Sequence, residues 1–421
     1  MKSSKNRSIY AWAFYDWANS AYVTTIIAGF FPIFFKEYFS ADVDVTVSTA
    51  QLGFANSISS LFIVLIAPLL GAIADAGGLK KRFLFLFAYL GILMSASLSF
   101  VSEGEWEAAV FVYALGNIGF MGSNVFYDSL LPTVAEDKKV DFVSGLGFAL
   151  GYLGGGILFS FNVWMLLDHD FFGLASRIEA VKLSFISVSI WWMLFSLPLL
   201  FFVKEKKSIE DKGTLQIISE GYGRLAGTIR KIRHLKGLLL FLIAYWLYID
   251  GVDTIIRMAV DYGMAIGLDS KSLILSLLIV QFLGFPATLL FAKLAEKWDT
   301  KKAILLAISV YLFITLWAAF LNQVYEFYIL AGMIALVQGG IQALSRSYYT
   351  KMIPEEYAAE FFGFYNFLGK TAAILGPLLI GMVALITENS RVGIASVAVS
   401  YTHLTLPTTI KPWRSRWWGG A

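Results

Sequence analysis

Long apolar runs alternate with short polar loops along almost the whole chain. Each run holds about 20 mostly apolar residues, which as an α-helix would cross roughly 30 Å of hydrocarbon. Lipid offers the backbone no water to bond, so such runs must be helical. We place about twelve of them, at residues 10–39, 50–74, 83–101, 109–131, 143–167, 182–203, 237–258, 273–292, 303–322, 327–349, 361–385 and from 391 onward. The pattern predicts an all-α integral membrane protein.

The overall composition agrees with a membrane location. Hydrophobic residues make up 58% of the chain, charged residues only 15%, and the mean hydropathy is +0.69. A soluble domain has a very different balance. The formal net charge of +3 creates no strong field for nucleic acid, and no nucleic-acid motif is present. We therefore expect the lipid bilayer as a partner and no nucleic acid.

Residues that commonly build catalytic or metal centres are scarce. The chain has no cysteine, which excludes disulfides, thiolate nucleophiles and cysteine metal sites. Its 3 histidines lack the spacing of a metal motif. An intramembrane enzyme would need a nucleophile beside a base, or a metal cluster, and the sequence shows neither. We predict that the protein is not an enzyme and uses no metal and no cofactor.

Positive charge falls in alternate loops. Lysine and arginine precede the first run and follow the second, fourth, sixth and eighth, at positions that include Lys2, Lys5, Arg7, Lys80, Lys81, Arg82, Lys138, Lys139, Lys204, Lys206, Lys207, Lys297, Lys301 and Lys302. The intervening loops instead carry acids such as Asp42, Asp44, Glu103, Glu105, Glu107, Asp168 and Asp170. Basic loops stay in the cytoplasm. We therefore expect a multi-pass protein of the cell (inner or plasma) membrane with a cytoplasmic N-terminus.

Two of the basic loops are alike and suggest an internal duplication. The positions that correspond are Gly71 with Ala292, Asp75 with Glu296, Lys80 with Lys301, Lys81 with Lys302 and, in later runs, Ser123 with Ser345, Tyr127 with Tyr349 and Pro132 with Pro354. Internal repeats of this kind are frequent in transporters. We predict an N-terminal six-helix bundle at 1–203, a cytoplasmic linker at 204–236 and a C-terminal bundle at 237–399.

The last apolar run is too short to cross a bilayer. It begins near Arg391 and ends near Val399, which is roughly 12 Å of helix. Residues 400–421 are polar, and residues 400–409 resemble translated sequencing-adapter sequence. We expect an incomplete twelfth helix followed by a non-native tail at 400–421. The alternative is a short re-entrant or interfacial C-terminus.

Several motifs resemble those of known transporters. Gly71, Asp75 and the basic residues 80–82 fit the loop between spans two and three of the major facilitator superfamily. Residues 14–22, FYDWANSAY, resemble the opening signature of the vacuole effluxer family, and the segments 127–132 and 339–349 are also similar to it. That family is best known for autophagy-related amino-acid efflux permeases. The resemblance implies the twelve-helix major facilitator fold, with two pseudo-symmetric six-helix bundles, and amino-acid transport.

Polar side chains form stripes on four of the predicted helices. Spacings of three and four place each stripe on one helical face. An ionisable group in a membrane is costly and usually faces a cavity, and the resemblance implies that these four helices line the central pathway. For substrate or protons we select Asp16, Asn19, Asn117, Asn124, Asp250, Asp253, Gln338 and Gln342. Asp250 is expected near or past the middle of the membrane, and Asp16 or Asp250 is the candidate for proton coupling.

Other charges lie near the expected cytoplasmic ends of their helices and suggest a gate. We assign to it Asp75, Lys80, Lys81, Arg82, Asp128, Glu296, Arg346 and Lys370. Three alternatives stay open. Asp16 could merely cap or anchor its helix, and Asp75 with the bases after it could be only a topology signal. Asp253 and Arg257 could form an intrahelical pair, because the acid stands four residues before the base.

Gly147, Gly151 and Gly155 recur at every fourth residue of the fifth run. A nucleotide-binding glycine loop would need a strand before it, and none is predicted here. Small residues at this spacing allow helices to pack closely in lipid. We predict that these glycines serve helix packing.

These features predict a secondary active transporter that works by alternating access, with two bundles rocking about a midplane site. We expect an amino acid or similar small polar metabolite as substrate, coupled transport of protons, and function as a monomer. The nearest rival is a drug or metabolite exporter of the same fold. From a different class, a non-transporting membrane sensor would typically add a soluble domain, and the sequence shows none.

Overall fold

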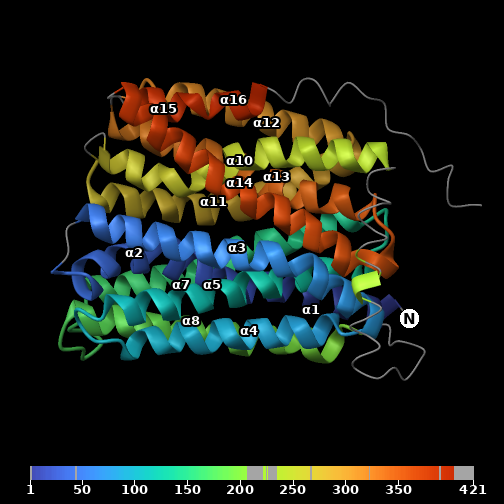
Figure 1. Ribbon diagram of the computed structural model, residues 1–421, viewed down its shortest axis with the longest axis horizontal. Coiled ribbons are helices and arrows are strands. Elements are labelled where there is room, and N and C mark those ends of the chain that lie inside the picture. The colour runs from blue at the N-terminus through green and yellow to red at the C-terminus, as the bar shows by residue number, and fades with distance from the viewer. Residues whose placement is uncertain are drawn as a thin grey trace, which may run out of the picture.

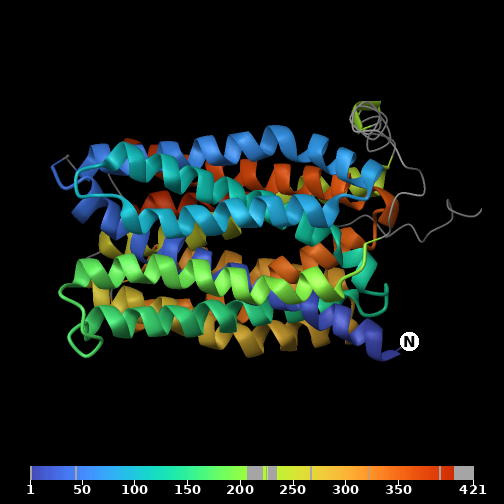
Figure 2. The same cartoon turned by 90° about the horizontal axis from the view of Figure 1, so that it is seen from below.

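The structure is a computed structural model that describes residues 2–42, 45–205, 221–223, 225, 235–265, 268–321, 323–387 and 390–402. Within these residues every regular element is helical. Figure 1 shows the long helices side by side along one axis, and Figure 2 shows the same arrangement from below. The predicted all-α class is confirmed.

The helices follow the apolar runs closely. In the N-terminal part they are α1 (Lys2–Ala21), η1 (Tyr22–Phe30), α2 (Phe31–Phe34), η2 (Phe35–Phe39), α3 (Val45–Gly77), α4 (Lys80–Ser97), η3 (Leu98–Phe100), α5 (Trp106–Ser129), α6 (Leu131–Val134), α7 (Val140–Leu167) and α8 (Arg177–Phe202). In the C-terminal part they are α10 (Lys236–Ala265), α11 (Ser270–Lys297), α12 (Thr300–Ala318), α13 (Val324–Thr350), η4 (Glu355–Tyr357), α14 (Ala358–Thr387), α15 (Ser390–Ser396) and α16 (Ala398–Thr402).

Among the described residues, 10 helices are long and apolar enough to cross a membrane. They coincide with the first ten predicted runs. The predicted eleventh run forms α14, of 30 residues, while the twelfth forms only α15 and α16, of 7 and 5 residues. The predicted count of twelve spans is thus confirmed in part.

The end of α16 passes the predicted boundary at Val399. Tyr401 is buried, and its ring stacks on Tyr311 of α12 with the ring centroids 6.1 Å apart. An added Cβ at Gly251 of α10 would overlap the same tyrosine ring, so the two helices approach closely here. The rest of the predicted tail, from residue 403 onward, lies outside the described residues.

Buried apolar side chains gather in two clusters. One is built from residues between Ala11 and Val203 together with Ala359, and the other from residues between Leu238 and Tyr401. In Figure 1 the blue-to-green helices accordingly lie together on one side and the yellow-to-red helices on the other. Most of the predicted linker, 206–220 and much of 224–234, lies outside the described residues. The division into two bundles joined by a linker stays a prediction.

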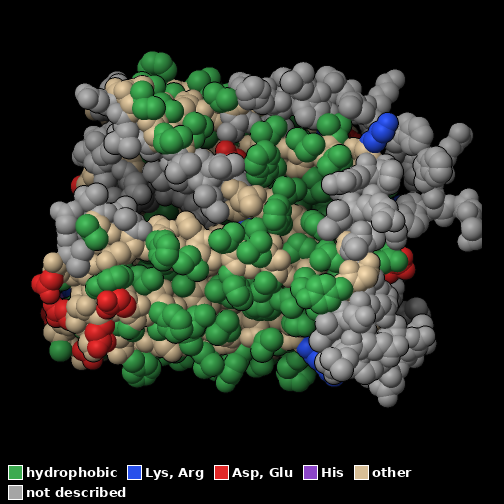
Figure 3. Space-filling view, viewed as in Figure 1, with side chains coloured by type: hydrophobic (Ala, Val, Ile, Leu, Met, Phe, Trp, Pro, Cys, Tyr) green, Lys and Arg blue, Asp and Glu red, His purple; other side chains and the backbone are tan. Residues whose placement is uncertain are grey.

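The surface has an apolar middle and charged ends, as expected for lipid contact. Figure 3 shows hydrophobic side chains across the middle and acidic side chains gathered at the end away from the N-terminus. We call the other end, which holds the N-terminus and the loops with Lys80 and Lys301, the basic end. Contacts there join helix ends that are distant in sequence: Ser8 Oγ donates to the carbonyl of Phe202 at 2.8 Å, and Lys81 Nζ donates to that of Val203 at 2.7 Å.

Glycines let helices touch where packing is tightest. An added Cβ at Gly151 of α7 would lie 2.5 Å from Ser20 Oγ of α1, and one at Gly155 would lie 2.6 Å from Thr24 Oγ1. The predicted packing role of this glycine stripe is confirmed. Between the two parts of the chain, a Cβ at Gly71 of α3 would overlap the carbonyl of Ala359 on α14. No larger side chain fits there without moving a helix.

Candidate functional site at the basic end

The side chain of Arg346 makes several bonds between the two parts of the chain. It comes from α13, is almost completely buried and enters the N-terminal part. Its Nη1 lies 2.9 Å from Asp128 Oδ1 on α5, and its Nη2 lies 3.4 Å from Asp16 Oδ2 on α1. Its Nε donates to Ser144 Oγ on α7 at 2.9 Å, and Nη2 donates to the Ser144 carbonyl at 3.0 Å. One guanidinium therefore joins three helices of the other part.

Aromatic rings surround this guanidinium. Its Cζ lies 4.9 Å from the ring centroid of Trp12, 5.4 Å from that of Tyr127 and 4.3 Å from that of Phe148. The Tyr127 hydroxyl donates to Asp16 Oδ2 at 2.8 Å, and the Trp12 indole donates to the Tyr127 carbonyl at 2.9 Å. Rings over a desolvated cation stabilise it by roughly 2 kcal/mol or more. The rings also exclude water from the ion pairs.

Gly147 makes room for the Arg346 cluster, which we define as Arg346, Asp16, Asp128, Ser144 and Tyr127. An added Cβ at Gly147 would lie 2.6 Å from Asp16 Oδ2, 2.9 Å from the Tyr127 hydroxyl and 3.1 Å from Arg346 Nη2. The glycine stripe thus continues into the cluster. Alanine at this position would displace the charged groups.

The Arg346 cluster holds one cation and two carboxylates. If both carboxylates are ionised, its formal charge is −1, and a single proton on either one makes it neutral. A net charge in a dry site is costly, and two carboxylates that share one cation titrate as a coupled pair. The cluster is therefore chemically able to hold one exchangeable proton. Asp16, Asp128 and Arg346 are all sequence-predicted residues, and the structure brings them together.

A second connection, the Asp75 bridge, lies between α3 and the start of α14. Asp75 Oδ1 lies 2.8 Å from Lys80 Nζ, and Oδ2 accepts a hydrogen bond from the Glu360 backbone amide at 2.8 Å. Lys80 Nζ also donates to the Glu355 carbonyl at 3.5 Å. The carboxylate therefore caps the first turn of α14, where the helix dipole favours negative charge.

The bases next to Lys80 have different surroundings. Lys81 Nζ donates to the carbonyls of Leu200 and Val203, at the C-terminal end of α8, and Arg82 is exposed. The structure does not bring these two to Asp75. Glu205 accepts from the backbone amides of Lys80 and Lys81 at 2.6 and 3.1 Å, and burial raises the pKa of that carboxyl.

A third connection, the Asp141 bridge, was missed by the sequence analysis. Asp141, in the first turn of α7, lies 2.6 Å from Lys351 Nζ at the end of α13 and accepts from Ser347 Oγ at 2.6 Å. Thr300 Oγ1, at the start of α12, donates to it at 2.9 Å. The sequence did offer one signal for Asp141, because it is an acidic residue directly after the basic residues Lys138 and Lys139. The symmetric candidate, Glu296, is instead exposed on α11.

The predicted pathway amides of the N-terminal part belong to two hydrogen-bonded groups, which together we call the polar network. Asn19 Nδ2 donates to Asn124 Oδ1 at 2.7 Å. Tyr22 donates to Asn117 Oδ1 at 3.2 Å, and Asn117 Nδ2 donates to Asn56 Oδ1 at 3.2 Å. Asn19 of α1 and Asn124 of α5 therefore face each other, and the pathway role of these stripes stays a prediction. Asn56 of α3 was missed, because a single amide in an apolar run gives no stripe.

The predicted residues of the C-terminal part are more scattered. Asp250 faces α14: an added Cβ at Gly376 would lie 3.0 Å from its Oδ1. Asp253 lies one turn later and is partly buried, while the side chain of Arg257 lies outside the described side chains, so the predicted intrahelical pair is untested. The remaining predicted residues, all partly buried, are Gln338 and Gln342 on α13 and Lys370 on α14. Asp16 and Asp250 thus occupy different sites.

Comparison with known proteins agrees with this architecture. A sequence model of the family described as vacuole effluxer Atg22 like matches residues 43–407. The chain belongs to that family. It is 38% identical to the uncharacterized MFS-type transporter YxiO of Bacillus subtilis over 93% of this chain and 91% of YxiO. It is 22% identical to autophagy-related protein 22 of Saccharomyces cerevisiae over 93% and 88% of the two chains.

Solved structures share the fold. The human organic anion transporter MFSD10 superposes with a TM-score of 0.73 at 12% identity, covering 96% of this chain and 99% of that one. The proton:xylose symporter XylE gives 0.73 at 14% identity, with 96% and 95% coverage. The predicted major facilitator fold and the family resemblance are confirmed. This protein is a multi-pass membrane transporter of the superfamily, which carries small molecules, and it is not an enzyme.

Proposed function

We propose that this chain is a proton-coupled transporter of amino acids or similar small polar metabolites, and that the Arg346 cluster is its gate and its proton site. The observation that carries this is the single buried guanidinium shared between Asp16 and Asp128. The basic end faces the cytoplasm of the cell in this proposal, the two bundles rock as units, and one chain is sufficient for transport.

The charge of the cluster supplies the coupling. A proton on Asp16 or Asp128 leaves a neutral group, which suits the closed and dry arrangement. Loss of that proton leaves a net negative charge that water must solvate, so it favours opening of the basic end. Breaking a buried ion pair by removing one partner costs roughly 3–5 kcal/mol. A free-energy change of that size shifts the ratio of open to closed molecules by roughly two to nearly four powers of ten.

The polar network beside the gate supports a small polar substrate. The amides of Asn19, Asn117 and Asn124 and the hydroxyl of Tyr22 offer donors and acceptors without a fixed charge. Asp250 and Asp253 add carboxylates on α10, which suit a substrate ammonium. A zwitterionic amino acid fits this set better than an apolar drug does. Metabolite-wide screening of the purified protein for thermal stabilisation tests the substrate class, and stabilisation by hydrophobic cations alone would instead favour the drug exporter.

The proton role is tested with pH jumps in proteoliposomes. Asp16→Asn should abolish uphill, proton-driven uptake while leaving substrate exchange largely intact, because exchange needs no net proton movement. Asp168→Asn is the control, since it removes an exposed carboxylate at the end of α7, outside both the cluster and the proposed substrate pathway. Proton-driven rates that are unchanged in both Asp16→Asn and Asp128→Asn would remove the cluster as the coupling site.

The absence of native cysteine makes the proposed orientation testable. Ser102→Cys at the acidic end should react with an impermeant maleimide added outside intact cells. Lys204→Cys at the basic end should react only after permeabilisation, as both positions are exposed in the fold. The opposite pattern would invert the topology.

A further inference from the structure

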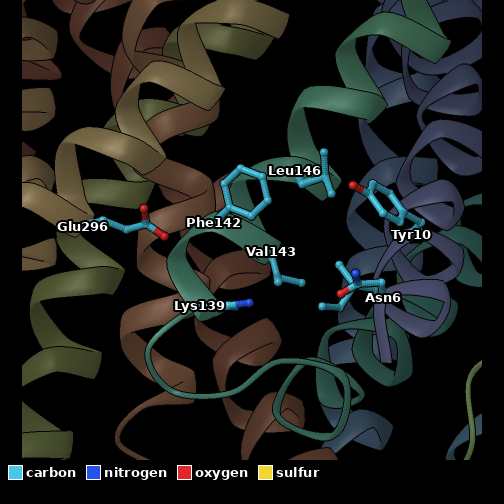
Figure 4. A pocket seen from close by; sticks show the side chains of 8 residues that line it. Asn6, Tyr10, Lys139, Phe142, Val143, Leu146 and Glu296 are labelled. Atoms are coloured by element: carbon cyan, nitrogen blue, oxygen red, sulfur yellow. The ribbon is translucent and has the colours of Figure 1, made fainter. Parts of the chain in front are cut away.

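A pocket at the basic end is lined by no residue of the Arg346 cluster. It has a volume of about 260 Å³ and is lined by Asn6, Ile9, Tyr10, Lys139, Phe142, Val143, Leu146 and Glu296. Figure 4 shows Glu296 of α11 on one side and Asn6 and Tyr10 of α1 on the other, with the residues around Lys139 between them. The pocket therefore lies between the N-terminal part and α11 of the C-terminal part.

Two opposite charges face this pocket without neutralising each other. Lys139, at the N-terminal boundary of α7, and Glu296, near the end of α11, are both exposed. Among the ion pairs of the described residues, neither side chain takes part in one. A bound molecule with an anionic and a cationic group can satisfy both. The amide of Asn6 and the hydroxyl of Tyr10 add neutral hydrogen-bonding groups.

The other lining side chains are apolar. Ile9, Phe142 and Leu146 are each partly exposed and face the same space as the charges. They lie within the first turns of α1 and α7, where the charged loops meet the apolar middle of the molecule. A ligand that combines a charged head with a hydrocarbon chain matches this order of side chains, and at this depth a membrane presents phospholipid headgroups.

We propose that this pocket binds a phospholipid with a primary ammonium, that is, the phosphatidylethanolamine class. Lys139 would hold the phosphate, Glu296 the ammonium, and the apolar side chains the first carbons of an acyl chain. A phosphatidylglycerol headgroup leaves Glu296 without a cation. A choline headgroup has no N–H donor for that carboxylate, so both bind less well.

The place of the pocket gives the bound lipid a structural effect. Directly beside it α7 and α11 touch, because an added Cβ at Gly145 would lie 2.6 Å from Ala292 Cβ. Ser144, the residue before Gly145, holds Arg346. A lipid that fills the space between α7 and α11 therefore stabilises the arrangement in which Arg346 is enclosed. This site does not depend on which substrate or ion the protein carries.

The test uses the full chain in nanodiscs made with phosphatidylethanolamine, phosphatidylcholine or phosphatidylglycerol. Native mass spectrometry should show about tenfold stronger retention of phosphatidylethanolamine than of its choline counterpart, with a higher thermal midpoint. Lys139→Gln and Glu296→Gln should each remove most of this preference. Lys138→Gln and Lys297→Gln are matched controls, because both lysines are exposed neighbours that do not line the pocket, and they should keep it.

A third variant separates pocket filling from loss of charge. Leu146→Trp should occupy the apolar part of the pocket and reduce lipid retention while both charges remain. Equal retention of all three lipids, or the same loss in the control variants, would overturn the proposal. Equal protection by water-soluble glycerophosphoethanolamine would also overturn it, since the acyl chain would then contribute nothing.

Discussion

The N-terminal and C-terminal parts of the chain each make an acid–base connection at the basic end, but with different residues. In the N-terminal part, Asp75 of the basic loop reaches across to cap α14 and binds Lys80. In the C-terminal part, the corresponding Glu296 is exposed. The carboxylate is supplied instead from the other side of the contact, by Asp141 of α7, which binds Lys351, Ser347 and Thr300. The acid of the Asp75 bridge thus comes from the basic loop itself, and the acid of the Asp141 bridge comes from the helix on the other side of the contact.

The difference matters because the two bridges have unequal access to water. The Asp75 side chain is 0% exposed and its partner Lys80 is 10% exposed, whereas the Lys351 side chain is 28% exposed. A cation that loses its partner can turn to water at the second bridge but not at the first. The Asp75 bridge should therefore contribute more to stability, although the Asp141 bridge has more hydrogen bonds.

The largest effect is expected for Asp75→Asn. It leaves the Lys80 ammonium buried without its carboxylate, which costs roughly 3–5 kcal/mol. The free energy of unfolding, from denaturation in mixed micelles, measures this. Lys80→Met together with Asp75→Asn should recover part of the loss, because the unpaired charge is then removed. A loss below 1 kcal/mol in the single variant would mean that water reaches the pair.

A smaller effect is expected for Asp141→Asn. Thr300 and Ser347 can still donate to the amide oxygen, and Lys351 can turn toward solvent, so we expect a loss of about 1–3 kcal/mol. The same unfolding assay measures it. Because the bridges share no residue, the losses in the Asp75→Asn and Asp141→Asn double variant should add. A combined loss well below the sum would show that the two bridges open together.

Almost no effect is expected for Glu296→Gln in detergent without phospholipid. Its carboxylate is exposed, and substitutions at such positions usually stay within about 0.5 kcal/mol. Lys297→Gln, one residue further on, serves as the control in the same assay. A loss as large as that of Asp141→Asn would restore the symmetric role that the loop comparison had predicted for Glu296.

Much of this architecture could be predicted from sequence because a bilayer restricts the choices. Apolar runs must be helices, so ten spans appeared where expected. Of the charges selected for the pathway and the gate, Asp16, Asp128 and Arg346 lie together, and all three are conspicuous in sequence as charges in apolar surroundings. The assumption of symmetry did less well: it selected Glu296 and gave no reason to select Asp141, whose partners come from α12 and α13.

Other residues escaped prediction because their partners are distant in sequence. Ser144 is an ordinary small residue until Arg346 donates to it. Asn56 becomes part of the polar network only through α5. Lys81 resembles Lys80 in sequence, but the turn at the start of α4 directs it to the carbonyls at the end of α8. The two lysines carry the same charge, but successive side chains of a helix point in different directions, so they meet different partners.

The enclosure of Arg346 determines which signal an experiment should record when the basic end opens. Its hydrogen bonds to Asp128 and to Ser144 come from one rigid plane, so the guanidinium cannot leave one partner gradually while keeping the others. Packed interfaces of this kind are bistable. We therefore expect distance distributions between fluorophores on the two halves to show two fixed peaks. A change of pH or ligand should alter the areas of those peaks and leave their positions where they are.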